Sequence, residues 1–240
     1  MLWKNISHIF RQVAGMPYEQ RMKSNKFIVI AIDGGAGSGK STTSRLISEK
    51  FNYMHVDTGS HYRLITHSLL NDGILPNDEE LSQNLNKFKL SSVITGKFCK
   101  LIINGVEVSN DQLRCENINL NVSSFASVPN IRSLVFDYQK SLVSLAEENS
   151  FSGVVMEGRD IGSVILPDAD LKLFLHANAE IRSVRRKSDG QEDSIKLRDK
   201  LDSTRKIAPL KAPLGSIPID TGVHSVDEVL KIISNHIDKL

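Results

Sequence analysis

Apolar residues along the chain form short continuous runs that alternate with segments of helical spacing. The short runs are rich in β-branched residues, as in strands buried on both faces of a sheet, and they predict strands at 27–32, 53–56, 154–156, 171–175 and 217–220. Apolar positions three and four apart predict helices at 41–51, 61–70, 78–87, 131–147, 179–187, 194–206 and 225–238. This alternation predicts an α/β fold with a parallel sheet covered by helices on both faces.

One segment, residues 88–109, has a different pattern. It is rich in strand-forming residues, and Asn104-Gly105 lies between two apolar runs. Asn-Gly is the preferred pair for a tight hairpin turn, because both residues tolerate a positive φ. We therefore expect a small antiparallel insertion with its turn at this pair.

Residues 1–25 differ from the rest of the chain. Apolar residues recur there at near-helical spacing, and the basic residues outnumber the single acid, Glu19. Two interpretations are open: a helix that packs on the core or on a partner, and an organelle-targeting segment, which is typically basic and poor in acids. The apolar residues are Leu2, Trp3, Ile6, Ile9, Phe10 and Val13, and the basic ones are Lys4, Arg11, Arg21 and Lys23.

The composition excludes a few classes of protein but does not by itself indicate a function. The 30 basic and 28 acidic residues give a formal net charge of +2, which argues against a protein that coats nucleic acid. Cys99 and Cys115 are far apart, so we expect reduced thiols in the cytoplasm rather than a disulfide or a metal site. No apolar run approaches the ~18 residues of a transmembrane helix, so no membrane association is expected.

A glycine-rich segment after the first predicted strand carries the strongest chemical signal. It matches G-x-x-x-x-G-K-[ST] in full, and a predicted helix follows it. Glycines allow backbone N–H groups to converge on phosphate oxygens, the lysine reaches the β- and γ-phosphates, and the Ser41 hydroxyl can bind Mg²⁺. The segment predicts a P-loop NTPase fold that uses ATP and Mg²⁺. Its residues are Gly34, Gly35, Ala36, Gly37, Ser38, Gly39, Lys40, Ser41 and Thr42.

Three polar segments follow later strands or lie on a late helix. Arg63 follows the second strand, and the adjacent Arg159 and Asp160 follow the strand at 154–156; both places lie where open α/β sheets bind ligands. Asp202 shares one helix face with Arg198 and Arg205, four and three residues away. A guanidinium matches phosphate oxygens, so these residues could hold a second phosphate. The alternatives are a surface arginine, a turn closed by its own ion pair and a solvated ladder of charges.

Taken together, these motifs resemble bacterial-type cytidylate kinases. The order is the phosphate loop, DTGSHYR (57–63), EGRDIG (157–162), LPDAD (166–170), RDKLDSTR (198–205) and PIDT (218–221). The resemblance covers about residues 27–235. It implies transfer of the ATP γ-phosphate to CMP or dCMP, with a cytidylate-kinase-like domain over 26–240, a monophosphate-binding insertion at about 60–125 and a lid at about 183–197. It also implies a monomer whose partners are small nucleotides.

The resemblance implies roles for individual residues. Ser123 lies six residues before Pro129 and Arg132 three after it, and with Asp160 they are expected to read the cytosine edge. Asp202 is expected to accept hydrogen bonds from the ribose hydroxyls. The residues expected to bind the substrate are Thr58, Arg63, Ser123, Arg132, Arg159, Asp160, Arg198 and Asp202. Those expected to stabilise the transferring charge are Lys40, Arg159, Arg182, Arg185, Arg198 and Arg205.

The chain departs from the family pattern in three places. The lid segment between Arg186 and Arg198 is short and acidic, Gly34-Gly35 replaces the usual Gly-Pro, and residues 1–25 have no counterpart. Other P-loop kinases, for UMP, AMP or shikimate, remain alternatives, as do a non-catalytic nucleotide-binding protein and a nucleic-acid-binding module. A GTPase is disfavoured because no N-K-x-D motif follows the loop.

Overall fold

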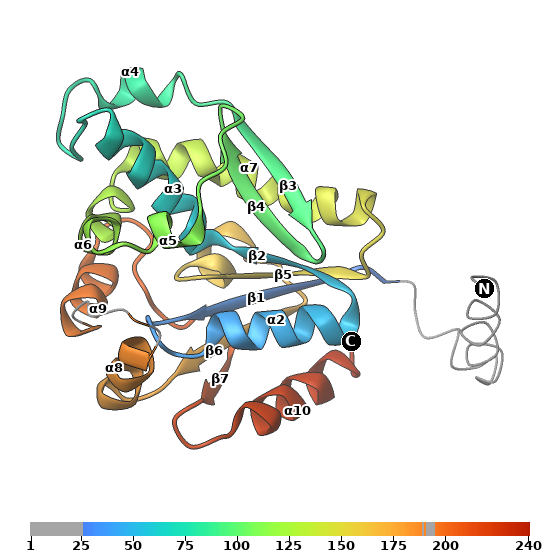
Figure 1. Ribbon diagram of the computed structural model, residues 1–240. Helices are drawn as coiled ribbons and strands as arrows, with labels where there is room; N and C mark the ends of the chain where they lie inside the picture. Colours follow the sequence, from blue (N-terminus) through green and yellow to red (C-terminus); the bar gives the residue numbers. More distant parts are fainter. Residues whose placement is uncertain (1–25, 189, 191–194) are drawn as a thin grey trace, which may run out of the picture.

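The computed structural model describes residues 26–188, 190 and 195–240, and residues 1–25 with both interpretations of them lie outside this part (Figure 1). Its strands are β1 (Ile28–Gly34), β2 (Tyr53–Asp57), β3 (Leu90–Thr95), β4 (Phe98–Ile103), β5 (Gly153–Gly158), β6 (Leu171–His176) and β7 (Ile217–Asp220). Its helices are α2 (Lys40–Phe51), α3 (Thr58–Asn71), α4 (Leu81–Leu85), α5 (Asn110–Leu113), α6 (Glu116–Phe125), α7 (Pro129–Glu148), a π-helix η2 (Ile161–Ile165), α8 (Ala179–Ser188), α9 (Ile195–Thr204) and α10 (Val226–Ile237).

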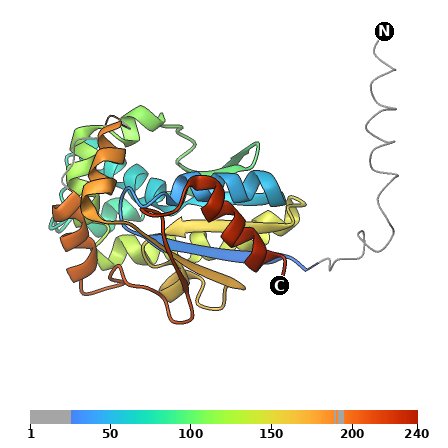
Figure 2. The same cartoon turned by 90° about the horizontal axis from the view of Figure 1, so that it is seen from below.

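The strands of the described residues form one sheet in the order β3-β4-β2-β5-β1-β6-β7. All neighbouring pairs are parallel except β3 and β4, which are antiparallel. The sheet is covered by helices on both faces, which confirms the predicted α/β fold. The carboxyl ends of the parallel strands lie at the end of the molecule that also carries α8 and α9, while the chain ends in α10 at the opposite end (Figures 1 and 2).

The two faces of the sheet have separate cores. Successive residues of β1 point to opposite faces, as the period of a strand requires: Ile30 and Ile32 pack with residues of α2 and α10, while Ala31 packs with residues of α7 and η2. All three side chains are fully buried. A strand with apolar residues at every position is therefore needed, as the run at 27–32 predicts.

A third core lies under the segment that follows β2. Helices α3, α4, α5, α6 and α7 and strand β4 contribute apolar side chains to it, among them the fully buried Phe125. This unit lies beside the carboxyl end of β2 and forms one wall of the site described below (Figure 1). The predicted helix at 78–87 is shorter, and only α4 is helical there.

The predicted turn at Asn104-Gly105 is not the hairpin turn. The antiparallel pair joins β3 to β4, and the two-residue turn between them is Gly96-Lys97, with Thr95 opposite Phe98. Asn104 and Gly105 do adopt positive φ angles of 54° and 77°, but only a single bridge from Ile103 to Val106 follows. β4 pairs along its whole length with β3, the strand before it, from the pair Thr95 and Phe98 to the pair Leu90 and Ile103, so the hairpin turn precedes β4. The insertion also extends the main sheet, because β4 pairs in parallel with β2.

Caps explain where the helices begin. Asp57 accepts a hydrogen bond from the Ser60 N–H at 3.3 Å, so α3 starts at Thr58, earlier than the apolar spacing indicates. Pro129 at the first position starts α7, since proline lacks only an N–H that is unpaired there in any case. Ser225 and Glu228 form a capping box at the start of α10.

Candidate functional site

The phosphate loop runs from the end of β1 to the first turn of α2, as predicted. Gly37 and Gly39 have positive φ angles of 73° and 83°, and a Cβ on Gly37 would meet the Arg182 carbonyl oxygen at 2.8 Å. The Ser38 hydroxyl is buried and has no hydrogen-bond partner among the described residues. Backbone of this shape at a helix N-terminus, beside an unpaired donor, is suited to an anion.

Lys40 lies inside this loop. Its Nζ donates to the Gly35 carbonyl oxygen at 2.8 Å, and the side chain is 7% exposed. Burial, followed by the positive charge of Arg159, lowers the pKa of Lys40 to about 7. The ammonium group therefore lacks a sufficient counter-charge, which the β- and γ-phosphates of a nucleotide would provide.

Two arginines of α8 lie against the loop. Arg182 donates to the carbonyl oxygens of Ala36 at 3.2 Å and Ala177 at 2.9 Å, and it forms an ion pair with Asp199 of α9 at 2.6 Å. Arg185 donates to the Gly37 carbonyl oxygen at 3.4 Å. Both predicted charge-stabilising residues are thus beside the place where a polyphosphate would lie.

Thr221, directly after β7, connects that strand to the phosphate loop and to Arg185, a role that the sequence did not indicate. Its hydroxyl donates to the Ser38 carbonyl oxygen at 3.1 Å and accepts from Arg185 Nη1 at 3.0 Å. The signals in the sequence were its place directly after a predicted strand and at the end of the PIDT segment (218–221).

A second cavity lies next to the loop, beyond the ends of β2 and β5. It brings together residues from α3, α6, β5 and α9 that are far apart in the sequence. Its lining contains most of the predicted substrate residues, namely Thr58, Arg63, Ser123, Arg159, Asp160, Arg198 and Asp202. It also contains Arg205, which was predicted to stabilise the transferring charge, together with Gly59, Tyr62, Val122, Ala126 and Gly158. Arg132 does not line the cavity directly but contacts Asp160 at its wall.

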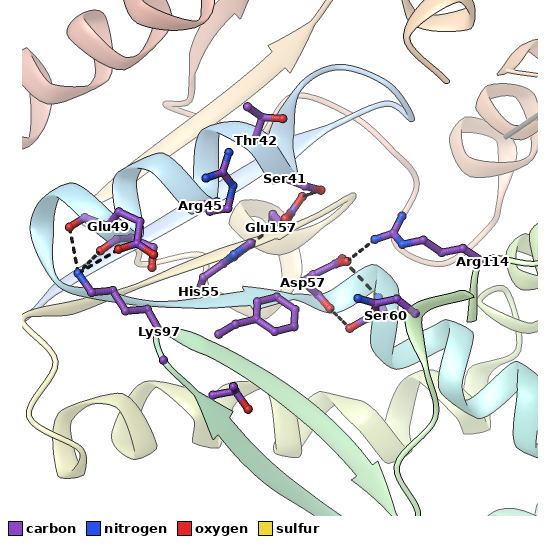
Figure 3. A pocket seen from close by; sticks show the side chains of 15 residues that line it. Ser41, Thr42, Arg45, Glu49, His55, Asp57, Ser60, Lys97, Arg114 and Glu157 are labelled. Atoms are coloured by element: carbon purple, nitrogen blue, oxygen red, sulfur yellow. Dashed lines mark hydrogen bonds and ion pairs between the residues drawn. The ribbon is translucent and has the colours of Figure 1, made fainter. Parts of the chain in front are cut away.

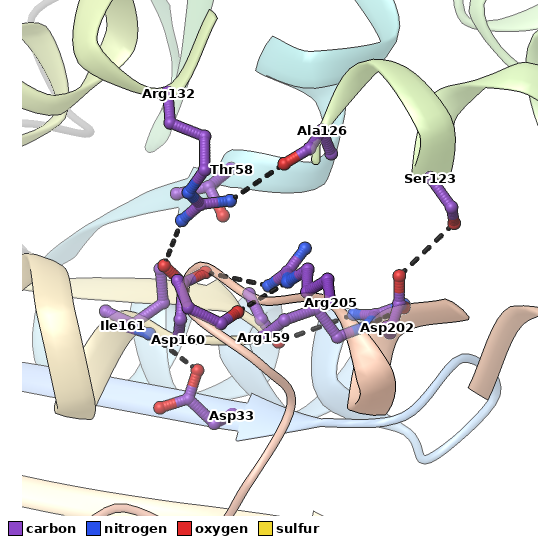
Figure 4. Close-up of polar contacts among 12 residues, drawn as sticks. Asp33, Thr58, Ser123, Ala126, Arg132, Arg159, Asp160, Ile161, Asp202 and Arg205 are labelled. Carbon is purple, nitrogen blue, oxygen red and sulfur yellow. Dashed lines mark hydrogen bonds and ion pairs between the residues drawn. The ribbon is translucent and has the colours of Figure 1, made fainter. Parts of the chain in front are cut away.

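The two acids of this cavity are paired with cations (Figure 4). Asp160 forms ion pairs with Arg132 and, at 3.5 Å, with Arg205. Asp202 accepts from Arg159 Nε at 2.9 Å and from the Ser123 hydroxyl at 3.2 Å. The cavity is therefore lined by a network in which each buried acid has cations beside it, and a ligand with phosphate and hydroxyl groups could exchange with these partners.

The two acids differ in their pKa. Burial raises the pKa of Asp160 above its ordinary value, and Arg132 and Arg205 offset this only in part. Burial also acts on Asp202, but the charges of Arg159 and Arg198 outweigh it and lower its pKa. Asp202 is thus a firmly ionised acceptor.

Arg63 is buried on α3 and is held from the neighbouring helices. Its Nη1 donates to Asn119 Oδ1 at 2.7 Å and to the Leu113 carbonyl oxygen at 3.0 Å. Burial, followed by the charge of Arg198, lowers its pKa to about 9. Asn119, which no motif of the sequence indicated, orients this cation.

Asp33, at the end of β1, holds the loop that carries Arg159 and Asp160. Its two carboxylate oxygens accept from the backbone N–H groups of Ile161 at 2.7 Å and Gly162 at 2.8 Å (Figure 4). Burial raises its pKa to about 6. The sequence did not indicate this role of Asp33, because its partners are 128 and 129 residues away.

A carboxylate next to the phosphate loop was likewise not assigned. Glu157 Oε2, at the end of β5, accepts from the Ser41 hydroxyl at 2.9 Å (Figure 3). A hydroxyl and a carboxylate that converge are hard oxygen ligands of the kind Mg²⁺ prefers. The described residues contain no group of three or more His, Cys, Asp or Glu placed to hold a metal. Mg²⁺ typically binds one or two protein oxygens and the phosphates of its nucleotide, and Ser41 and Glu157 are the residues here that could supply such oxygens.

The structure also places the remaining predicted site residues, apart from part of the expected lid. Ser41 and Thr42 form the first turn of α2 beside Glu157. Arg198 and Arg205 reach the second cavity from α9 and the residue after it. The expected lid, about residues 183–197, contains 189 and 191–194, which lie outside the described residues. No helix of the described residues is long and apolar enough to cross a membrane.

Comparison with known proteins shows the family of the chain. The family model described as "Cytidylate kinase" matches residues 30–239. A cytidylate kinase of Clostridium tetani is 41% identical over 223 residues, which cover 88% of this chain and 94% of the relative. One of Limosilactobacillus reuteri is 37% identical over 227 residues, with coverages of 89% and 96%. One of Fusobacterium nucleatum is 38% identical over 225 residues, with coverages of 89% and 98%. The chain belongs to the cytidylate kinase family.

Proposed function

We propose that this protein transfers the γ-phosphoryl group of ATP to CMP or dCMP, giving ADP and CDP or dCDP in pyrimidine nucleotide metabolism. The observation that carries the proposal is the pairing of two sites. A phosphate loop with a buried lysine lies beside a cavity with buried arginines and acids. The positive charge of Arg159, which lines that cavity, helps to lower the pKa of Lys40.

The donor site is the phosphate loop. ATP binds there with its β- and γ-phosphates against the backbone N–H groups and Lys40. Arg182 and Arg185 exchange their contacts with loop carbonyl oxygens for contacts with phosphate oxygens. Because these arginines already lie on the loop, little side-chain rearrangement is needed.

The acceptor site is the second cavity. Arg63, Arg159 and Arg198 bind the phosphate of CMP, and Thr58 lines the site. Asp202 accepts from the ribose hydroxyls, and Ser123, Arg132 and Asp160 hydrogen-bond the edge of the cytosine. Asp160 already sits between cations, so a base that offers a donor and acceptors could replace part of the network.

The chemistry then needs position and charge rather than a base. An oxygen of the CMP phosphate attacks the γ-phosphorus, the bond between that phosphorus and the β–γ bridging oxygen breaks, and ADP leaves with the electron pair. The attacking oxygen is already anionic at neutral pH, so no proton has to be removed. Lys40 and the arginines at 159, 182, 185, 198 and 205 stabilise the charge on the transferring group.

Ser41 and Glu157 are the residues that would hold Mg²⁺ directly or through water. An ion held there would supply positive charge to offset that of the phosphates. The contact between the two side chains is 2.9 Å long and keeps both oxygens at one place beside the loop.

Measurement of ADP release with ATP–Mg²⁺ and each of CMP, dCMP, UMP, AMP, GMP and shikimate tests the proposal. We expect turnover with CMP and dCMP well above that with the other acceptors. Equal ADP release with and without any acceptor would show an ATPase instead. Best turnover with UMP, AMP or shikimate would show another small-molecule kinase.

We further propose that the protein acts as a monomer in the cytoplasm, with an insertion at about 60–125 and a lid at about 183–197, and without nucleic acid as a partner. Sedimentation at micromolar concentration would test the monomer, since a dimer would sediment as about twice the chain mass of 26.7 kDa.

A further inference from the structure

A histidine lies behind the carboxylate that binds Ser41. His55, in β2, places Nε2 at 2.8 Å from Glu157 Oε1, while Glu157 Oε2 accepts from the Ser41 hydroxyl. Glu157 is 2% exposed and His55 is 7% exposed. The three side chains form a continuous chain from the sheet to the phosphate loop, at the edge of a cavity of about 480 Å³ between α2, β2 and the β3–β4 hairpin (Figure 3).

The His55 ring is fixed from the side of the insertion. The Phe98 ring packs against it edge to face, with centroids 5.1 Å apart and an angle of 73°. The backbone N–H of His55 donates to the Lys97 carbonyl oxygen at 2.7 Å. Because the ring cannot easily turn, its Nε2 can hold the carboxylate in one rotamer. Since Glu157 accepts at both oxygens, Nε2 is the donor in this contact.

Asp57, another acid that lines this cavity, is already used elsewhere. Asp57 accepts from the Ser60 N–H as the cap of α3 and forms an ion pair with Arg114 at 3.3 Å (Figure 3). Glu157 is therefore the carboxylate available to Ser41, and the contact that orients it is the one with His55.

We propose that His55 is a positioning residue for phosphoryl transfer. By holding Glu157 Oε1, it keeps Oε2 turned toward Ser41 and the Mg²⁺ that accompanies ATP. This inference rests on the proposed function. Residues that orient metal ligands in this way commonly affect metal affinity or activity about 10–100-fold when they are replaced.

The test compares ATP binding with and without Mg²⁺ by isothermal titration calorimetry of the full chain. In His55→Phe, which keeps a ring against Phe98 but removes the donor, we expect the affinity for ATP with Mg²⁺ to fall about tenfold or more. The affinity for ATP in EDTA should change less than about twofold. The kcat should fall as well, whereas the KM for CMP should change little, because the acceptor site does not contact His55.

His55→Gln should restore most of the loss, since its amide nitrogen can donate to Glu157 from nearly the same place. Met54→Leu is the matched control: it is the preceding buried residue of β2 and belongs to the core of the other face. It should leave both ATP affinities and kcat near those of the unchanged protein.

Equal loss of affinity with and without Mg²⁺ in His55→Phe, or no recovery in His55→Gln, would overturn the inference. If His55→Phe does not fold, the comparison of His55→Gln with His55→Asn, whose amide is too short to reach Oε1, decides the question; equal Mg²⁺ effects in the two would also overturn it. Failure of the proposed function would look different, because the unchanged protein itself would show no turnover with CMP.

Discussion

Burial is the main influence on the pKa values of two ionisable side chains in and next to the phosphate loop. Asp33 directly precedes the phosphate loop and Lys40 lies in it, and burial is the main reason why the pKa of the first rises to about 6 and that of the second falls to about 7. Asp33 is compensated by two backbone N–H donors, whereas Lys40 has one carbonyl oxygen. Lys40 is thus the group left to be completed by a ligand, and Asp33 is a structural acid.

Replacing Lys40 should remove a charge that acts directly on the transferring phosphate. We expect Lys40→Ala to lower kcat about 10²–10³-fold or more, in line with the loss of one preorganised stabiliser. Steady-state kinetics with saturating ATP–Mg²⁺ and CMP would measure it. Lys50→Ala, an exposed lysine in the last turn of the same helix, should be nearly neutral. A kcat for Lys40→Ala close to that of the unchanged protein would contradict the mechanism.

Asp33→Asn should destabilise the fold at pH 7 even though it removes a buried charge. One of the two backbone donors then faces an amide N–H₂, and an unsatisfied buried group costs about 1–3 kcal/mol. The expected loss in the free energy of unfolding can be measured with urea. Asp137→Asn, on the exposed face of α7, should cost much less.

We also expect the stability difference between the unchanged protein and Asp33→Asn to depend on pH. The pKa of Asp33 is raised in the folded state, so between about pH 4 and 6 the folded protein binds more protons at this residue than the unfolded chain does. Its contribution to the free energy of unfolding therefore decreases as the pH rises through that window. The stability advantage of the unchanged protein over Asp33→Asn should shrink from pH 4 to 6 and stay constant above it. An advantage that grew over this range would contradict the assignment.

At the scale of elements, the sequence predicted motifs formed by one continuous segment but did not predict contacts between distant residues. The phosphate loop could be predicted because its nine residues, Gly34–Thr42, act as one continuous segment. The contact of Ser41 with Glu157 spans 116 residues, and those of Asp33 span still more, so no spacing along the chain indicates them. The hairpin prediction failed because Gly96 and Asn104-Gly105 both permit a tight turn, and only the pairing of β4 with β3 decides between them.

Helix α9 illustrates a prediction from periodicity. Arg198, Asp202 and the following Arg205 were expected on one face, and they do line one cavity. Periodicity could not identify their partners. Asp202 binds Arg159, from the loop after β5, and Ser123, from α6.

Removal of the α9 carboxylate should affect the acceptor more than the donor. We expect Asp202→Ala to raise the KM for CMP about tenfold or more, the cost of a lost hydrogen bond to a charged group, with a smaller rise for ATP. The rise should be smaller for dCMP, which has one ribose hydroxyl fewer. Lys200→Ala on the exposed side of the helix serves as the control. Equal increases in KM for CMP and ATP would refute the placement of Asp202 at the acceptor.

At the scale of the whole molecule, both sites are formed at the same end of one sheet. β1 delivers the phosphate loop, β5 delivers Arg159, Asp160 and Glu157, and β2 leads into α3 with Thr58 and Arg63. Since β5 lies between β1 and β2, the acceptor cavity is necessarily adjacent to the donor loop. This order of strands is the reason why one loop after β5 can serve both substrates.

The fate of the γ-phosphoryl group tests the central claim most directly. The protein would be mixed with γ-³²P-labelled ATP, Mg²⁺ and CMP, and the labelled products separated. We predict that nearly all transferred label appears in CDP and little in inorganic phosphate, because CMP occupies the place that water would need. Label found mainly in inorganic phosphate, at a rate independent of CMP, would contradict the account.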